Sequence, residues 1–247
     1  MSRIEISGAK AEAFRSPNTH LTRRGILGAG LAFSLHGAGT SYANSNLESE
    51  LTADSTPAEV LAYLYSGNER FLNGEPLAKH RNIERVRQVA KEQKPFAAFL
   101  GCADSRVPIE ILFDQGFGDL FVTRIAGNIA SSENVGSLEF GTLLLGARVL
   151  YVLGHTNCGA VAATIQGKEV PGQFSGLFQY IRPAAKEAKG DLGKAVELNV
   201  RNQATALAES SPVIAQLIRE KRLAIAGGVY DLSTGKVTPV DLKFESQ

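Results

Sequence analysis

Two short runs of residues contain both cysteines of the 247-residue chain. The run CADSR begins at Cys102, and the run HTNC begins at His155 and ends at Cys158. Two thiolates, an imidazole and a carboxylate are the ligand types that zinc prefers in proteins. The runs therefore predict a Zn²⁺ site on Cys102, His155 and Cys158, in which Asp104 is either a fourth ligand or a neighbour of the metal.

Arg106 can hold the Asp104 carboxylate away from a metal ion. Three protein ligands and an open fourth position are typical of a catalytic zinc site, whereas four protein ligands are typical of a structural one. With Asp104 paired to Arg106, water takes the fourth position, and zinc lowers its pKa from about 16 to near 7. The pattern favours an enzyme that uses a zinc-bound hydroxide, with Asp104 and Arg106 as a dyad that controls access to the metal.

The elements that must position these residues are strands and helices in alternation. Apolar runs predict strands at 96–101, 120–125, 149–154 and 223–229 and an edge strand near 236–242. Helical spacing of apolar residues predicts a helix at 57–72. We also expect a largely polar helix at 81–93, a short helix at 109–113, a long helix at 131–147 with apolar or small residues on most faces, and helix within 174–220. We expect the 131–147 helix to be buried, and Cys158 to open a helix of its own, where the helix dipole favours a thiolate.

This alternation predicts an α/β fold with a mainly parallel sheet of four strands plus an edge strand, flanked by helices. Functional groups gather beyond the carboxyl ends of such strands. Cys102 follows the first predicted strand and His155 follows the third. The topology therefore brings Cys102 and Cys158 together, although they are far apart along the chain.

The first 43 residues resemble a twin-arginine (Tat) signal peptide. Arg23 and Arg24 precede a weakly apolar run at 26–35, and the small residues Ser41 and Ala43 precede a cleavage point before Asn44. The alternative interpretation of this segment is a disordered cytoplasmic leader. We expect a signal peptide at 1–43, a linker at 44–56 and one domain at 57–247, in a protein that is periplasmic or otherwise exported.

The composition excludes several partners. Cleavage would remove five basic and two acidic residues from totals of 26 and 25, which leaves a net charge near −2. No basic run suits nucleic acid, and no apolar stretch in the mature chain is long enough to span a membrane. A disulfide between Cys102 and Cys158 is an alternative in an exported protein. A route that carries folded, metal-loaded proteins argues against it.

Several motifs together resemble the β-class carbonic anhydrases, from about Pro57 to Lys243. These motifs are GCADSRV at 101–107, DLFV at 119–122, AGN at 126–128, GSLEF at 136–140 and GHTNCG at 154–159. The resemblance implies a β-carbonic-anhydrase-like fold and the reversible hydration of CO₂ to bicarbonate and a proton. It also implies one Zn²⁺ per subunit on Cys102, His155 and Cys158, beside the Asp104 and Arg106 dyad, in a homodimer or homotetramer.

The resemblance further implies a set of substrate-binding residues. Gln93 and the Gly159 backbone N–H would donate hydrogen bonds to the substrate, and Phe121 and Ala126 would line a small apolar pocket. Phe140 stands where the family often has a tyrosine that reaches the partner subunit's site, so the hydroxyl is missing here. Members that bicarbonate inhibits at a second site carry a tryptophan at the position of Phe99, and this chain has no tryptophan.

Two other functions remain open from the sequence. A relative on the same scaffold could hydrolyse carbonyl sulfide or carbon disulfide with similar zinc chemistry. A non-enzymatic exported protein could hold a closed four-ligand zinc or a disulfide. The spacing of Asp104 and Arg106 argues against this second function.

Overall fold

The computed structural model describes residues 51–52, 54–167 and 171–242. The expected signal peptide at 1–43 and most of the expected linker therefore lie outside the described residues. No helix in the described ranges is both long and apolar enough to cross a membrane.

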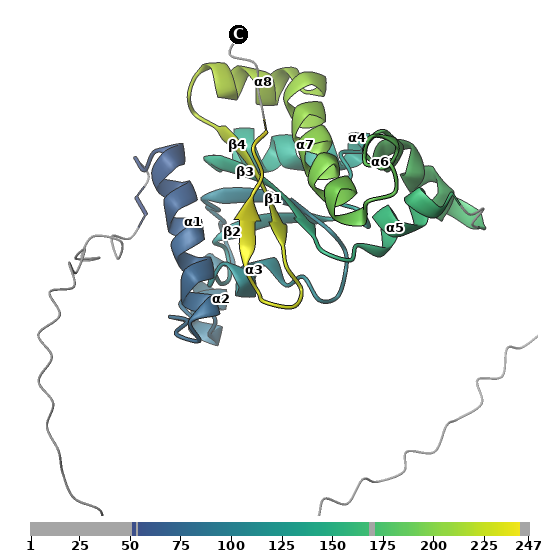
Figure 1. Ribbon diagram of the computed structural model, residues 1–247. Coiled ribbons are helices and arrows are strands. Elements are labelled where there is room, and N and C mark those ends of the chain that lie inside the picture. Colours follow the sequence, from purple (N-terminus) through teal and green to yellow (C-terminus); the bar gives the residue numbers. More distant parts are fainter. Residues whose placement is uncertain (1–50, 53, 168–170, 243–247) are drawn as a thin grey trace, which may run out of the picture. The chain divides into compact units, whose positions relative to one another are not determined.

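A five-stranded sheet forms the centre of the described domain (Figure 1). Its strands are β1 (Ala97–Gly101), β2 (Leu120–Arg124), β3 (Val149–His155), β4 (Ala224–Tyr230) and β5 (Val237–Pro239), in the order β2-β1-β3-β4-β5. The first four pair in parallel, and β5 is an antiparallel edge strand. Strands β1 and β3 are buried along their whole length, which explains why their sequences are continuous apolar runs. The predicted fold class is confirmed.

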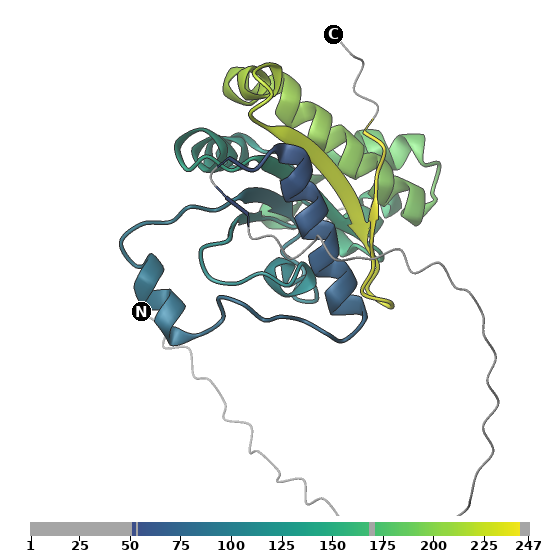
Figure 2. The ribbon, with the colours of Figure 1, turned by 90° about the vertical axis from the view of Figure 1, so that its left-hand side faces the viewer.

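Helices cover both faces of this sheet (Figures 1 and 2). Helices α1 (Pro57–Leu72) and α3 (Ile109–Leu112) contribute to the core on one face, and α7 (Leu192–Ser210) and α8 (Pro212–Arg219) to that on the other. The remaining helices are α2 (Ile83–Val89), α4 (Ser132–Glu139), α5 (Gly159–Gln166) and α6 (Ser175–Glu187), with a 3₁₀ turn at Gly172–Phe174. Helix α1 begins where expected, because Thr56 and Glu59 form a reciprocal capping box before it.

Two helix predictions need correction. The helix expected at 81–93 is only Ile83–Val89, because none of its residues is buried and no packing favours extension to Gln93. The helix expected at 131–147 ends as α4 at Glu139 and continues as a single π-helical segment, Phe140–Leu144. Its expected burial is wrong, since in this chain Phe140 is 45% exposed and Leu144 is 68% exposed.

Asp114 fixes the chain between α1 and α2. Its fully buried carboxylate accepts hydrogen bonds from the backbone N–H groups of Leu77 (2.8 Å) and Ala78 (3.0 Å). It also accepts from Arg70 Nε (2.8 Å) and from an Arg81 guanidinium N–H (3.2 Å). Burial alone would raise the pKa of Asp114, but the donors outweigh it and hold the pKa below its ordinary value.

Candidate metal centre

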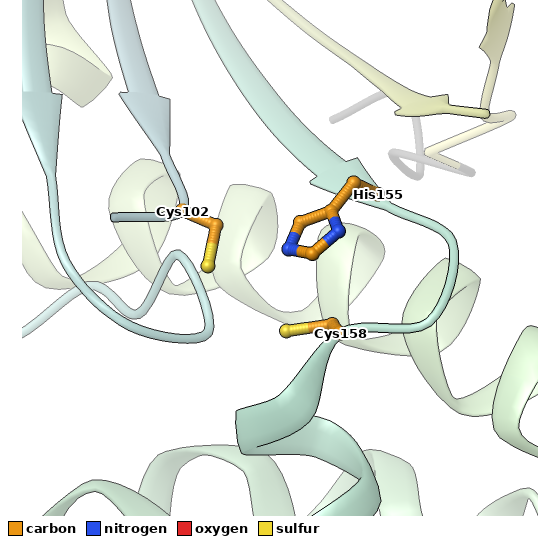
Figure 3. A group of neighbouring side chains, drawn as sticks. All are labelled: Cys102, His155 and Cys158. Atoms are coloured by element: carbon orange, nitrogen blue, oxygen red, sulfur yellow. The ribbon is translucent and has the colours of Figure 1, made fainter. Parts of the chain in front are cut away.

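Three buried side chains converge where β1 and β3 end (Figure 3). Cys102 directly follows β1, His155 is the last residue of β3, and Cys158 is the N-cap of α5. Their ligand atoms all lie within 4.8 Å of one another. The strands pair in parallel, so their carboxyl ends meet at one edge of the sheet. The expected proximity of Cys102 and Cys158 is confirmed.

In the imidazole of His155, one nitrogen is hydrogen-bonded and the other has no hydrogen-bond partner. Its Nδ1 lies 2.9 Å from the carbonyl oxygen of Thr156, which can only accept, so Nδ1 carries the hydrogen. The other nitrogen, Nε2, is buried and has no hydrogen-bond partner. A buried polar atom without a partner is unusual. This lone pair belongs to the same cluster as the two sulfurs, which is the arrangement that a zinc ligand requires. The residues therefore fit a zinc ion.

Both cysteines are free thiols, so the structure does not contain the alternative disulfide between Cys102 and Cys158. A hydrogen bond from Cys158 lowers the pKa of Cys102, and the same contact raises the pKa of Cys158. The backbone N–H of Gly127 also points at the Cys102 sulfur, at 3.4 Å. This N–H donor favours the thiolate form of Cys102.

Asp104 lies beside the cluster and is held by Arg106. The guanidinium donates from Nε to Oδ1 (2.9 Å) and from Nη2 to Oδ2 (2.8 Å) of the carboxylate. This hydrogen-bonded pair holds the pKa of Asp104 well below its ordinary range. Oδ2 lies 3.8 Å from Nε2 of His155. The carboxylate is thus within reach of the ligand cluster while both of its oxygens are engaged by Arg106.

Arg124 at the end of β2 braces the loop that carries this dyad. Its side chain donates to the carbonyl oxygen of Cys102 (2.9 Å) and to that of Asp104. No role at the metal centre was predicted for Arg124 from the sequence. Its position at a strand end beside Cys102 was the available signal for this bracing contact.

Two of the expected substrate-binding residues, Ala126 and Gly159, lie at the cysteine cluster, and the other three lie away from it. Ala126 packs in the same apolar cluster as Cys102 and Cys158, and Gly159 directly follows Cys158 as the first residue of α5. Gln93 lies before the amino end of β1, whereas Cys102 follows its carboxyl end. The five residues of β1, about 16 Å of strand, lie between them in the chain. Within one chain, Gln93 is therefore not part of the cluster.

Phe121 and Phe140 form a second group away from the cysteines. Their ring centroids are 6.1 Å apart, and Gly141 packs closely on the Phe121 ring. Phe121 pairs with Ala98, three rows before the end of β1. The structure thus brings Phe121 and Phe140 together and leaves them at a distance along the strands from Cys102.

Known proteins are similar to this chain in sequence and in fold. A family profile described as "Carbonic anhydrase" matches residues 97–237. A carbonic anhydrase of Mycolicibacterium smegmatis is 36% identical over 192 residues, which cover 74% of this chain and 93% of the relative. Carbonic anhydrase 2 of Mycobacterium tuberculosis is 35% identical over 191 residues, with coverage of 74% and 92%.

Solved structures give the same result for the architecture. The β-carbonic anhydrase of Coccomyxa, in complex with acetazolamide, superposes with a TM-score of 0.56 at 26% identity, covering 76% of this chain and 87% of that one. A β-carbonic anhydrase of Aspergillus fumigatus has a TM-score of 0.61 at 24% identity, with coverage of 76% and 92%. A Cys-His-Cys cluster at the ends of parallel strands, a matching family profile and close relatives lead to one conclusion: the chain belongs to the β-class carbonic anhydrases.

Proposed function

We propose that the enzyme hydrates CO₂ at a zinc ion held by Cys102, His155 and Cys158, with Asp104 kept off the metal by Arg106. The observation that carries this proposal is the unpartnered Nε2 of His155 within 4.8 Å of two free thiols. Zinc bound there supplies the chemistry, because it lowers the pKa of a bound water to near 7 and makes it a nucleophile.

The residues around the metal then divide the remaining work. Arg106 engages both oxygens of Asp104, so the carboxylate stays ionised and would be kept from binding the metal itself. With zinc bound, Oδ2 of Asp104, the oxygen near His155, would accept a hydrogen bond from the nucleophile and so orient its lone pair toward the carbon of CO₂. The apolar neighbourhood of Ala126 suits a linear, nonpolar substrate. One proton per turnover leaves for the solvent.

The proposed activity is tested with an assay that distinguishes hydration of CO₂ from hydrolysis of related substrates. Residues 44–247 should hydrate CO₂ in a stopped-flow pH-indicator assay and contain about one zinc per subunit. A Cys158→Ser variant, which loses one sulfur, should lose both zinc and activity. Hydrolysis confined to carbonyl sulfide or carbon disulfide would contradict the choice of substrate. Zinc-free protein with full activity would contradict the metal site.

A second copy of the chain would complete the substrate pocket. Gln93, Phe121 and Phe140 lie away from the cysteine cluster of their own chain, so they would serve the site of another subunit. The π-helical segment exposes Phe140, Leu143 and Leu144, which have 45%, 43% and 68% of their surface accessible. Apolar surface of this kind favours burial in a homodimer or homotetramer. A monomer at micromolar concentration in sedimentation velocity would contradict this assembly.

Export is proposed on the sequence alone. The arginine pair at 23–24 and the small residues before Asn44 support a twin-arginine route. Residues 1–43 fused to a reporter should direct it out of the cytoplasm, and an Arg23→Lys, Arg24→Lys variant should retain it there. Equal export of both fusions would contradict the proposed route.

A further inference from the structure

Helix α7 carries two buried amide side chains on a largely apolar face. Asn199 and Gln203 are only 1% and 3% exposed, and they lie one helical turn apart. Amides are seldom this buried unless their donors and acceptors are paired. Their hydrogen-bond partners therefore indicate what these two residues do.

The two amides bind the segment that follows β2. Nδ2 of Asn199 donates to the carbonyl oxygen of Gly127 (2.9 Å), and Oε1 of Gln203 accepts from the backbone N–H of Ala130 (2.8 Å). Nε2 of Gln203 donates to Oδ1 of Asn199 and to the carbonyl oxygen of Tyr180, both at 3.1 Å. Gln203 thus orients Asn199, and together they hold Gly127 and Ala130 in place.

The same segment contacts a predicted metal ligand. The backbone N–H of Gly127 donates to Sγ of Cys102 at 3.4 Å. Gly127 has φ +77°, and Asn128 N–H bonds to the carbonyl oxygen of Ile125 (2.9 Å), so the segment is a tight turn. Movement of the Gly127 carbonyl would swing this turn and change the direction of the N–H that faces the sulfur.

We infer that Asn199 and Gln203 are positioning residues for the metal centre, because they hold the Gly127 N–H against the Cys102 thiolate. This inference rests on the proposed function, since the cluster must bind zinc. An N–H donor withdraws electron density from a thiolate, so zinc remains a stronger Lewis acid. Partners of this kind around metal ligands typically change metal affinity or activity ~10–100-fold.

An Asn199→Leu variant tests the contact, because it keeps the number and branching of the side-chain heavy atoms and removes their hydrogen bonds. With Co²⁺ in place of zinc, the thiolate-to-metal absorption band reports the electron density on sulfur directly. The variant should shift this band to longer wavelength. Its Zn²⁺ affinity in competition with a chromophoric chelator should fall ~10–100-fold, because the bound thiolate loses a hydrogen bond that stabilises it relative to the protonated thiol of the metal-free protein. A Gln203→Leu variant keeps the Asn199 contact with Gly127, so both changes should be smaller and in the same direction.

Asn68 provides a matched control for the loss of a buried amide. Its side chain is 2% exposed and donates to the carbonyl oxygens of Leu112 and Gly235, on the opposite face of the sheet. Asn68→Leu should lose stability and leave the cobalt band and zinc affinity as in the unmodified protein. An equal band shift in Asn68→Leu would overturn the inference, because it would indicate general loosening.

The outcomes separate this inference from the function on which it rests. Asn199→Leu and Gln203→Leu variants with the band and affinity of the unmodified protein would overturn the positioning role alone. Unmodified protein that binds neither Zn²⁺ nor Co²⁺ would overturn the metal site, and the inference with it. Should Asn199→Leu fail to fold, Gln203→Leu decides by the same two measurements, because it perturbs the same network from its far end.

Discussion

Replacing Gly127 by alanine tests the close packing behind the metal cluster. Gly127 has φ +77°, a conformation that disfavours residues with a β-carbon. A β-carbon placed there would lie 2.6 Å from Cδ1 of Ile181 and 3.3 Å from Cβ of Ala160. The first distance is far inside van der Waals contact, and Ile181 is fully buried. Both the backbone and the core therefore oppose the substitution.

The two costs can be estimated separately. The left-handed conformation costs a residue other than glycine about 1–2 kcal/mol. Inserting a methyl group into a packed core costs about 1–3 kcal/mol. Gly127→Ala should therefore lower the free energy of unfolding by about 2–5 kcal/mol, a large part of the 5–15 kcal/mol typical of a domain.

An Ile181→Val substitution removes the atom that the new methyl group would strike. Alone, it should cost about 0.5–1.5 kcal/mol. In the Gly127→Ala background it relieves the clash and leaves the backbone strain. The double variant should therefore be more stable than the sum of the single effects by about 1–3 kcal/mol.

Urea unfolding of the zinc-loaded proteins, followed by circular dichroism at fixed protein concentration, measures the free energy of unfolding. The four proteins compared are the unmodified protein, the two single variants and the double variant. Gly136→Ala is the matched control, because Gly136 lies within α4 and a β-carbon there meets no atom within 4 Å. It should leave stability unchanged or raise it by about 1 kcal/mol. Additive effects in the cycle, or a Gly127→Ala variant as stable as Gly136→Ala, would refute the reasoning.

Three further predictions concern the dyad, acid stability and the metal. Arg106→Ala should lower kcat/KM for CO₂ by about 100-fold and retain zinc, whereas Arg222→Ala, whose side chain is equally exposed at 55%, should leave both unchanged. High turnover in Arg106→Ala would contradict the dyad. The pKa of Asp114 is lowered by folding, so its carboxylate stabilises the protein above the unfolded pKa of about 3.9 and this contribution is lost as the pH falls through the folded pKa. Asp114→Asn should therefore be less stable at pH 7 and show a flatter decline below pH 4, and parallel curves in acid unfolding would contradict this. Chelation should abolish activity and speed alkylation of Cys102 and Cys158, and Zn²⁺ should reverse both effects. An alkylation rate that is the same with and without the chelator would contradict the metal site.

The local sequence pattern was sufficient to predict the strands that position the metal-binding residues. The apolar runs before Cys102 and His155 predicted two buried strands, and β1 and β3 are buried throughout. A run that is apolar on both faces can only be stable between two layers, so the layered sheet follows from composition. Because parallel strands end together, the convergence of the two segments also follows.

Helix ends and surface exposure were not predictable in the same way. The largely polar region at 81–93 was expected to be helical throughout, yet α2 stops at Val89, and none of its residues is buried. The apolar residues at 140–144 suggested a core helix, but they lie on the surface of this chain, where a partner could cover them. Spacing indicates which residues share a face and does not indicate what that face meets.

The sequence by itself thus determined the layered sheet, the ligand types and their meeting point, because each depends on residue type and on short-range periodicity. Only the tertiary structure decided which nitrogen of His155 lacks a partner, how Arg106 engages Asp104, and that Asn199 reaches Gly127 from a helix 72 residues later in the chain. These features depend on the directions of individual hydrogen bonds between distant segments, and those directions exist only once the segments have packed.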